Sequence, residues 1–193
     1  MGKVIVMNNV TLDGVMQGPG RPDEDTRGGF SDGGWAVRYA DHATVLKMGE
    51  RMGPEHAFLF GRRTYEQLLE SWNTRGGPFK EALNSTLKYV ASGDPATMLG
   101  WPNSTLISGD VPAAVKELRE SSPLNLVIMG SGMLIRSLMA ADHIDEYLLM
   151  IHPLVLGSGQ QLFARGTKTP LRLLEANHTA TGVLMALYTP DRP

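Results

Sequence analysis

Two glycine-containing turns carry the residues best suited to binding an anion. In the first, Gly61 follows an apolar run, and Arg62-Arg63-Thr64 stand at the start of a segment with helical spacing. A helix N-terminus presents free backbone N–H groups and the positive end of the helix dipole, and arginine and threonine side chains there bond phosphate oxygens. The sequence therefore predicts a phosphate site at residues 61–64. The alternative is a capped helix with exposed arginines.

The second turn is Gly130-Ser131-Gly132, which joins an apolar run to the helical segment that contains Leu134. Glycine at such a turn lets a pyrophosphate approach the backbone closely, although an ordinary strand-to-helix turn has the same pattern. Ligands of open α/β sheets bind beyond the carboxyl ends of the strands, so both turns would lie at one edge. The usual dinucleotide fingerprint and the P-loop are both missing, so a cofactor would be held by another arrangement.

A third stretch, Asn9-Val10-Thr11-Leu12-Asp13-Gly14-Val15-Met16, leaves the first predicted strand and enters a long loop. Asp13 is the candidate catalytic residue, a polar group close to the reacting atom, and the alternative is that Asp13-Gly14 is only a turn. Residues 11–40 contain many glycines and an acidic cluster. A loop of this length inside a compact domain is often functional.

Three aromatic residues are candidates for the walls of a substrate pocket: Phe30, Trp35 and Trp72. Phe30 and Trp35 lie in the glycine-rich loop, where they could stack on a flat ligand or form part of a lid. The alternative is that both side chains only pack the loop onto the domain.

The composition excludes several classes of protein. The 193 residues include no cysteine, which excludes disulfides, thiolate zinc sites and cysteine nucleophiles. None of the five histidines has metal-ligand spacing, so no metal is predicted. A formal net charge of -2, without a run of Lys or Arg, argues against nucleic-acid or membrane-surface binding. No apolar run reaches the roughly 18 residues of a membrane span, and a cytoplasmic location follows as the default.

A series of strands and helices must position these residues. Apolar β-branched runs predict strands, and apolar residues three or four apart predict helices. The predicted strands are 3–10, 57–60, 87–91, 104–107, 126–129, 144–151, 171–177 and 183–188. The predicted helices are 41–52, 62–72, 112–120 and 133–140. Asp41 is the expected N-cap of the first helix, whose apolar positions include Val45 and Leu46.

The order of these elements predicts the fold class. Strands alternate with helices between residues 40 and 150, and strands alone follow. This order indicates an α/β fold with helices on both faces of a largely parallel sheet and an antiparallel C-terminal edge. Residues 72–78 and 92–103 are predicted to be loops, because the pattern resumes after each. The whole chain, residues 1–193, is therefore expected to form one domain.

A set of short motifs occurs in one order along the chain. They are Thr11-Leu12-Asp13-Gly14, Gly61-Arg62-Arg63-Thr64-Tyr65-Glu66, Gly130-Ser131-Gly132, Ile144-Asp145-Glu146-Tyr147, Pro153, Leu156-Gly157-Ser158-Gly159 and Leu162-Phe163. Together they resemble the reductase domain of the riboflavin-biosynthesis deaminase–reductase and, more closely, stand-alone proteins of the dihydrofolate reductase family. The resemblance implies a dihydrofolate reductase-like fold, a central mixed sheet of about eight strands flanked by helices. It also implies binding of NADPH.

The resemblance implies roles for individual residues. Residues 61–64 would lie at the adenosine 2′-phosphate and pyrophosphate, and Ser92 at the adenine ribose or its phosphate. Gly130-Ser131-Gly132 and the start of the next helix, including Leu134, would hold the pyrophosphate and the nicotinamide half, and residues 10–15 would line the nicotinamide. Members of the family are often homodimers, so a homodimer is expected here, with the C-terminal strands as its interface.

The activity implied is NADPH-dependent reduction of a small heterocyclic or carbonyl substrate, of the 5-amino-6-(5-phosphoribosylamino)uracil reductase or dihydrofolate reductase type. The deaminase half has no counterpart, because its zinc site needs cysteines. A dihydrofolate reductase carries a pterin-binding carboxylate on the helix after the long loop, where Asp41 is the nearby candidate. Two alternatives stay open: a dihydropterin reductase that uses Asp41, and a non-catalytic NADPH- or metabolite-binding protein on the same fold.

Overall fold

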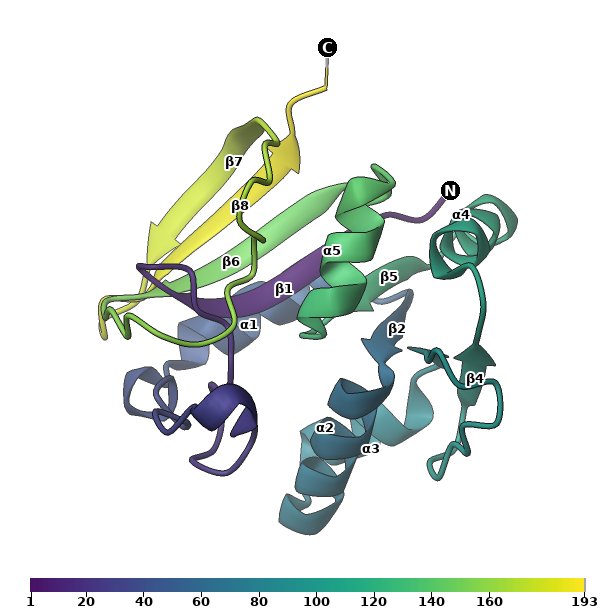
Figure 1. The fold of residues 1–193 in the computed structure, drawn as a ribbon, viewed down its shortest axis with the longest axis horizontal. Coiled ribbons are helices and arrows are strands. Elements are labelled where there is room, and N and C mark those ends of the chain that lie inside the picture. The colour runs from purple at the N-terminus through teal and green to yellow at the C-terminus, as the bar shows by residue number, and fades with distance from the viewer. Residues whose placement is uncertain (193) are drawn as a thin grey trace. The chain divides into compact units, whose positions relative to one another are not determined.

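The computed structural model of the chain describes residues 1–192 (Figure 1). These residues contain eight strands and five α-helices. The strands are β1 (Val4–Thr11), β2 (His56–Gly61), β3 (Lys88–Ala91), β4 (Ser104–Ile107), β5 (Asn125–Ile128), β6 (Glu146–His152), β7 (Leu171–His178) and β8 (Leu184–Pro190). The helices are α1 (His42–Met52), α2 (Arg62–Arg75), α3 (Pro78–Ser85), α4 (Val111–Ser121) and α5 (Gly132–Ala140). Two 3-10 helices, η1 (Arg27–Gly29) and η2 (Val37–Tyr39), lie in the long loop before α1.

The strands form one mixed sheet in the order β4-β3-β2-β5-β1-β6-β8-β7. β2 pairs in parallel with β3 and β5, and β3 with β4, whereas β8 pairs antiparallel with β6 and β7. The predicted α/β fold with its antiparallel C-terminal edge is therefore confirmed. The predicted strands match the observed ones to within two residues at each end, where assignments commonly vary. Within residues 1–192, no helix is both long and apolar enough to cross a bilayer.

The segment after α2 differs from the prediction, because residues 72–78 do not form one loop. α2 continues to Arg75, and α3 begins at Pro78, directly after Gly76-Gly77. Proline is tolerated in the first turn of a helix, where its missing N–H would have no intrahelical partner. Buried Leu83 anchors α3 to the unit. The paired glycines obscured the helix in the sequence, because such pairs are typical of loops.

Lys88 stabilises the C-terminal end of α3 from the strand that follows it. Its side chain is fully buried, and its ammonium group donates hydrogen bonds to the backbone carbonyls of Leu83, Asn84 and Thr86. These bonds satisfy carbonyls that the end of a helix leaves without intrahelical partners. Burial lowers the pKa of Lys88 to about 8.

The described chain divides into two compact units. The first comprises Met1–Ile5 and Met52–His143, and the second comprises Val6–Arg51 and the chain from Ile144 onward. Each unit has its own buried apolar side chains, such as Phe58 in the first and Tyr147 in the second. The single domain over residues 1–193 stays a prediction.

In the first unit, the turns that follow the parallel strands lie at the carboxyl ends of those strands, on the same side of the sheet. Gly61 pairs with Ala91, and Ala91 pairs with Ile107, so β2, β3 and β4 end level with one another. The turns that carry Gly61 and Ser92 therefore follow the carboxyl ends of neighbouring strands. The turn at Gly130 follows β5, which is the other parallel neighbour of β2.

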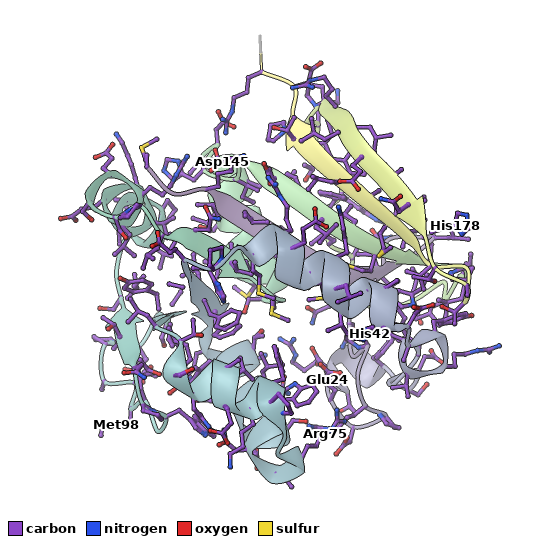
Figure 2. All side chains as sticks on the ribbon, turned by 180° about the vertical axis from the view of Figure 1, so that it is seen from behind. Glu24, His42, Arg75, Met98, Asp145 and His178 are labelled. Carbon is purple, nitrogen blue, oxygen red and sulfur yellow. The ribbon has the colours of Figure 1, made fainter. Side chains whose placement is uncertain are left out.

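In the second unit, α1 begins where the sequence predicted, and Figure 2 labels its first residue, His42. Asp41 is confirmed as its cap, since the backbone N–H of Ala43 donates to Asp41 Oδ1 at 2.9 Å. The predicted helix is confirmed, although the apolar positions that indicated it do not form a buried face. Val45 and Leu46 are 63% and 61% exposed, and the helix has no buried residue.

Ion pairs attach α1 to the strands of its unit instead. The ammonium group of Lys47 donates to the carboxylate of Glu175 on β7 at 2.7 Å. The guanidinium group of Arg51 bonds the carboxylate of Glu146, the first residue of β6, which is 4% exposed. Lysine and arginine can cover apolar surface with their stems while their charged ends find partners, so the apolar positions of a helix need not form its inner face.

Candidate functional site

The two predicted phosphate-binding turns meet through the side chain of Ser131. Its Oγ accepts a hydrogen bond from the backbone N–H of Gly61 at 2.8 Å and lies 2.7 Å from the hydroxyl of Thr64. Ser131 is held in the left-handed region at φ 63° and ψ 70°, a conformation that few residues other than glycine adopt. Strain of this kind persists where surrounding contacts enforce it, and here both hydroxyl contacts do so.

Two glycines are needed for this close approach. A Cβ on Gly61 would lie 2.4 Å from Ser131 Oγ, and a Cβ on Gly130 would lie 3.1 Å from Thr64 Cγ2. Gly130 also has φ 97°, which a side chain would strain. The glycines of the two motifs therefore allow two backbone turns to pack against each other.

The N-termini of α2 and α5 differ from that of α4 in their caps. At α4, the carboxylate of Asp110 accepts a hydrogen bond from the N–H of Ala113 at 3.0 Å. No side chain in residues 1–192 caps α2 at Gly61 or α5 at Ser131. The first-turn N–H groups of both helices therefore keep their capacity to bind an anion.

The pair of hydroxyl groups adds one more donor. Ser131 Oγ already accepts from Gly61, and one of the two hydroxyls must donate to the other. Each hydroxyl carries one proton, so the second proton has no partner within this pair and can meet a phosphate oxygen. Backbone N–H groups and a hydroxyl donor together are chemically suited to a phosphate group.

Other predicted cofactor residues of the first unit have contacts of their own. Arg62 pairs with Glu66 at 3.1 Å, with both side chains nearly half exposed, and Arg63 is exposed. Ser92 follows β3 and is 8% exposed, and its hydroxyl lies 2.7 Å from that of Thr97. Leu134 and Gly132 lie in the first turn of α5, where the Leu134 side chain is buried.

In the second unit, Asp13 joins two loops. Its carboxylate accepts hydrogen bonds from the hydroxyl of Thr11 at 2.5 Å and from the backbone N–H groups of Leu156 and Gly157 at 3.3 and 2.7 Å. The hydroxyl bond from Thr11 is the largest cause that holds the pKa of Asp13 below its usual value, with the two backbone bonds acting in the same direction. The carboxylate therefore stays ionised at neutral pH, with donors on both of its oxygens.

The residues on either side of Asp13 form a tight turn. Val10 and Val15 are buried, and Gly14 turns the chain at φ 82°. The N–H of Val15 donates to Thr11 Oγ1 at 2.9 Å, which closes the turn. The stretch therefore has one defined conformation, set by its own hydrogen bonds.

Phe30 and Trp35 lie together in the second unit, and Trp72 has its own contacts in the first unit. Phe30 and Trp35 form a buried cluster with Val15, and the indole N–H of Trp35 donates to the carbonyl of Gln17 at 2.7 Å. Trp72 belongs to the first unit, where its ring packs edge-on against Phe79 with centroids 4.8 Å apart.

Gln17 is a buried residue that sequence reasoning missed. Its amide N–H group donates to the carbonyls of Asp25 and Arg27 at 3.2 and 3.0 Å, and its amide oxygen accepts from the N–H of Gln160 at 2.9 Å. Gln17 is 4% exposed. No local pattern marks it, because one of its partners is 143 residues away in the sequence.

The comparisons with known proteins agree on one fold. The family model of the RibD C-terminal domain matches residues 2–185. The uncharacterized protein YwjB of Bacillus subtilis (strain 168) is 29% identical over 174 residues, covering 89% of this chain and 88% of YwjB.

Two solved structures are also similar to the chain. A diaminohydroxyphosphoribosylaminopyrimidine deaminase/5-amino-6-(5-phosphoribosylamino)uracil reductase of Thermotoga maritima has a TM-score of 0.67 at 14% identity, covering 98% of this chain and 56% of that one. A dihydrofolate reductase of Enterococcus faecalis, solved with NADP(H) and RAB-propyl, has a TM-score of 0.64 at 12% identity, covering 99% and 98%. The dihydrofolate reductase-like fold expected from the motifs is therefore confirmed.

Proposed function

The chain belongs to the family of RibD C-terminal domains, and from this premise we propose that it is an NADPH-dependent oxidoreductase. One observation supports the proposal most strongly. Ser131 holds two helix N-termini together, neither has a side-chain cap among the described residues, and one hydroxyl proton between them is left for a ligand. This arrangement matches the chemistry of a bound phosphate.

The residues of the first unit are proposed to bind the phosphate-bearing half of NADPH. Backbone N–H groups at the start of α2 and α5 would bond the pyrophosphate, with the free hydroxyl proton of the Ser131–Thr64 pair as a further donor. Arg62 and Arg63 would neutralise the 2′-phosphate, and Ser92 would flank the adenine ribose. The bound cofactor supplies a hydride, and the protein orients it and excludes water.

The residues of the second unit are proposed to act on the nicotinamide and the substrate. Residues 10–15 would contact the nicotinamide, and Phe30 and Trp35 would contact a small heterocyclic or carbonyl substrate, of the pterin or ribosylaminopyrimidine class. Asp13 would act as an ionised group that positions the Leu156 and Gly157 loop, since its oxygens already accept three hydrogen bonds. A proton needed by the substrate would then come from another donor.

A non-catalytic NADPH- or metabolite-binding protein is the second candidate function. It is favoured because the two candidate catalytic or substrate-binding carboxylates, Asp13 and Asp41, already accept hydrogen bonds within the protein. Asp13 is bonded to backbone and hydroxyl donors, and Asp41 caps α1. A screen of pterins, ribosylaminopyrimidines and small carbonyl compounds for NADPH oxidation separates the two functions. Tight NADPH binding without turnover of any compound in these classes would favour the second.

A double substitution tests the 2′-phosphate contact. Arg62→Gln/Arg63→Gln is expected to weaken NADPH binding by about 10-fold or more and NADH binding by less than about 3-fold, because charge-assisted bonds to the 2′-phosphate are lost. Calorimetric titration with both nucleotides measures the change. Arg75→Gln is the matched control, since Arg75 is the last residue of the same helix and lies over the Trp72 ring. Equal losses for NADPH and NADH would contradict the assignment.

The antiparallel edge of the sheet is proposed as a homodimer interface. β7 is the edge strand, and most of its residues are exposed, including Leu173 at 51% and Leu174 at 44%. A long exposed edge strand with apolar side chains is a template for pairing with another chain. Light scattering is expected to give twice the chain mass of 21.0 kDa, and Leu173→Lys/Leu174→Lys to give a single chain. A wild-type mass of one chain at micromolar concentration would refute the dimer.

A further inference from the structure

His152, the last residue of β6, is buried beneath the long loop of the second unit. It is 4% exposed, and its Nε2 lies 2.9 Å from the amide oxygen of Asn9 on β1. The rings of Trp35 and Tyr39 pack against the imidazole with centroids 5.1 and 5.5 Å away, at interplanar angles of 86° and 66°. Both aromatic residues belong to residues 17–40, here called the covering loop.

One nitrogen of this imidazole has no hydrogen bond. His152 Nδ1 is buried and finds no partner among residues 1–192. Buried polar atoms are almost always paired, and an unpaired one opposes the closed conformation. Because Nε2 faces an amide oxygen, it is the nitrogen that carries the proton of the neutral ring. A second proton on Nδ1 would be buried without an acceptor, and burial lowers the pKa of His152 to about 4.

The covering loop is tied to itself and to its unit as one piece. The N–H of Gly34 donates to the carbonyl of Gly18 at 2.7 Å, and the N–H of Ala36 to that of Pro19 at 3.1 Å. The hydroxyl of Thr181 donates to the carbonyl of Tyr39 at 2.9 Å. The side chains that the loop places on His152 therefore cannot leave it singly without breaking these bonds.

We propose that His152 is a positioning residue that seats the covering loop, and that protonation of its Nδ1 releases the loop. In the closed loop the neutral ring fits, with one N–H to Asn9 and its faces and edges against two aromatic rings. When the loop opens, water can accept the second N–H, so the open form binds the additional proton. The inference rests on contacts within the second unit alone and does not depend on the proposed function.

Other titratable side chains of the loop lie near the ring. The phenol of Tyr39 belongs to the ring that packs on the imidazole, and the guanidinium of Arg38 lies 5.1 Å from the centroid of the Tyr39 ring. From β1 the ring meets the uncharged amide of Asn9.

Two acids of the loop bond other residues of the loop. Glu24 accepts hydrogen bonds from the backbone N–H groups of Gly20 and Arg21. Asp25 bonds Arg27, and this contact lowers the pKa of the Asp25 carboxyl, which therefore stays ionised near pH 5.

The sign of the pH dependence follows from the two forms. The closed form has the depressed pKa of about 4, and the open form has the ordinary value of 6.5, so opening takes up a proton between these values. Opening should therefore become more frequent as the pH falls. Between pH 7.5 and pH 5 the opening constant is expected to rise about 30-fold.

Hydrogen exchange measures this opening directly. The backbone amide of Gln160 donates to Gln17 Oε1 at 2.9 Å, a bond that joins the covering loop to a segment outside it and is lost when the loop opens. After correction for intrinsic exchange rates, the protection of the Gln160 amide in the protein without ligand is expected to fall about 30-fold from pH 7.5 to pH 5. Amides of β2, in the other unit, provide the internal reference. A wild-type loop whose protection changes less than about 2-fold would overturn the proposal.

Three variants assign the effect to His152. His152→Phe keeps a ring against Trp35 and Tyr39 but cannot take up a proton, so the pH dependence of loop protection should disappear. Asn9→Asp places a carboxylate beside Nε2, which lets the closed ring hold its second proton and should also abolish most of the dependence. His42→Gln, an exposed histidine in the same unit, should behave as the wild type.

The variants also remain informative if one fails to fold. Wild-type pH dependence retained in either His152→Phe or Asn9→Asp would overturn the proposal, and so would its loss in His42→Gln. If His152→Phe is unfolded, the comparison of Asn9→Asp with the wild type decides alone. Since none of these measurements uses a nucleotide, failure to bind NADPH would leave them unaffected.

Discussion

Gly61→Ala is expected to weaken NADPH binding about 10- to 100-fold, because a shift of about 1 Å in a positioning element has effects of this size. The new Cβ would lie 2.4 Å from the Oγ and 2.9 Å from the Cβ of Ser131. Rotation of the hydroxyl relieves only the first contact, so the turn itself must move. The bonds that Ser131 makes to Gly61 and Thr64, which align the ends of α2 and α5, are then lost. Calorimetric titration with NADPH measures the effect.

Two further variants test whether the loss is steric. Gly93→Ala changes a glycine that follows β3 in the same unit, where no described atom lies within 4 Å of the added Cβ, and should bind NADPH as the wild type does. In a Ser131→Gly background, which lacks the overlapping atoms, Gly61→Ala should cause little further loss of affinity. Wild-type affinity in Gly61→Ala would show that the turn does not position the cofactor.

Arg51→Met is expected to lower the free energy of unfolding by about 2 kcal/mol, because it removes the partly exposed cationic partner of a buried carboxylate. Glu146 is 4% exposed at the start of β6, and the guanidinium of Arg51 is its cationic partner from α1. Without that charge, the buried carboxylate loses the attraction that compensates for its desolvation. Urea unfolding followed by tryptophan fluorescence measures the change.

The matched controls separate charge burial from general disruption of the helix. Glu66→Gln breaks the pair with Arg62, whose side chains are 46% and 47% exposed, and should cost no more than about 0.5 kcal/mol. Arg51→Met/Glu146→Leu removes both buried charges and should be more stable than Arg51→Met alone. A loss in Arg51→Met no larger than that in Glu66→Gln would contradict the prediction.

The sequence by itself predicted the elements whose patterns are local. The runs at β2 and β5 and the helical spacing of α2 depend on residues within a few positions of one another, which is the range over which apolar periodicity reports a buried face. The same holds for the cap at Asp41 and for the turns at Gly61 and Gly130. The exception is α3, whose helical signal was weaker than the loop signal of Gly76-Gly77 before it.

Only the tertiary structure decided what the polar side chains do. Ser131 bonds Gly61 from 70 residues away, and Asp13 bonds Gly157 from 144 residues away. His152 and Glu146 look like ordinary polar residues in a strand, yet both are buried because segments distant in the sequence cover them. A hydrogen bond or an ion pair depends on the position of both partners in space, and local periodicity contains no information about the second partner. For this protein, local pattern was therefore sufficient to predict the α/β class and the turns at Gly61 and Gly130, whereas the roles of Ser131, Asp13 and His152 required the folded chain.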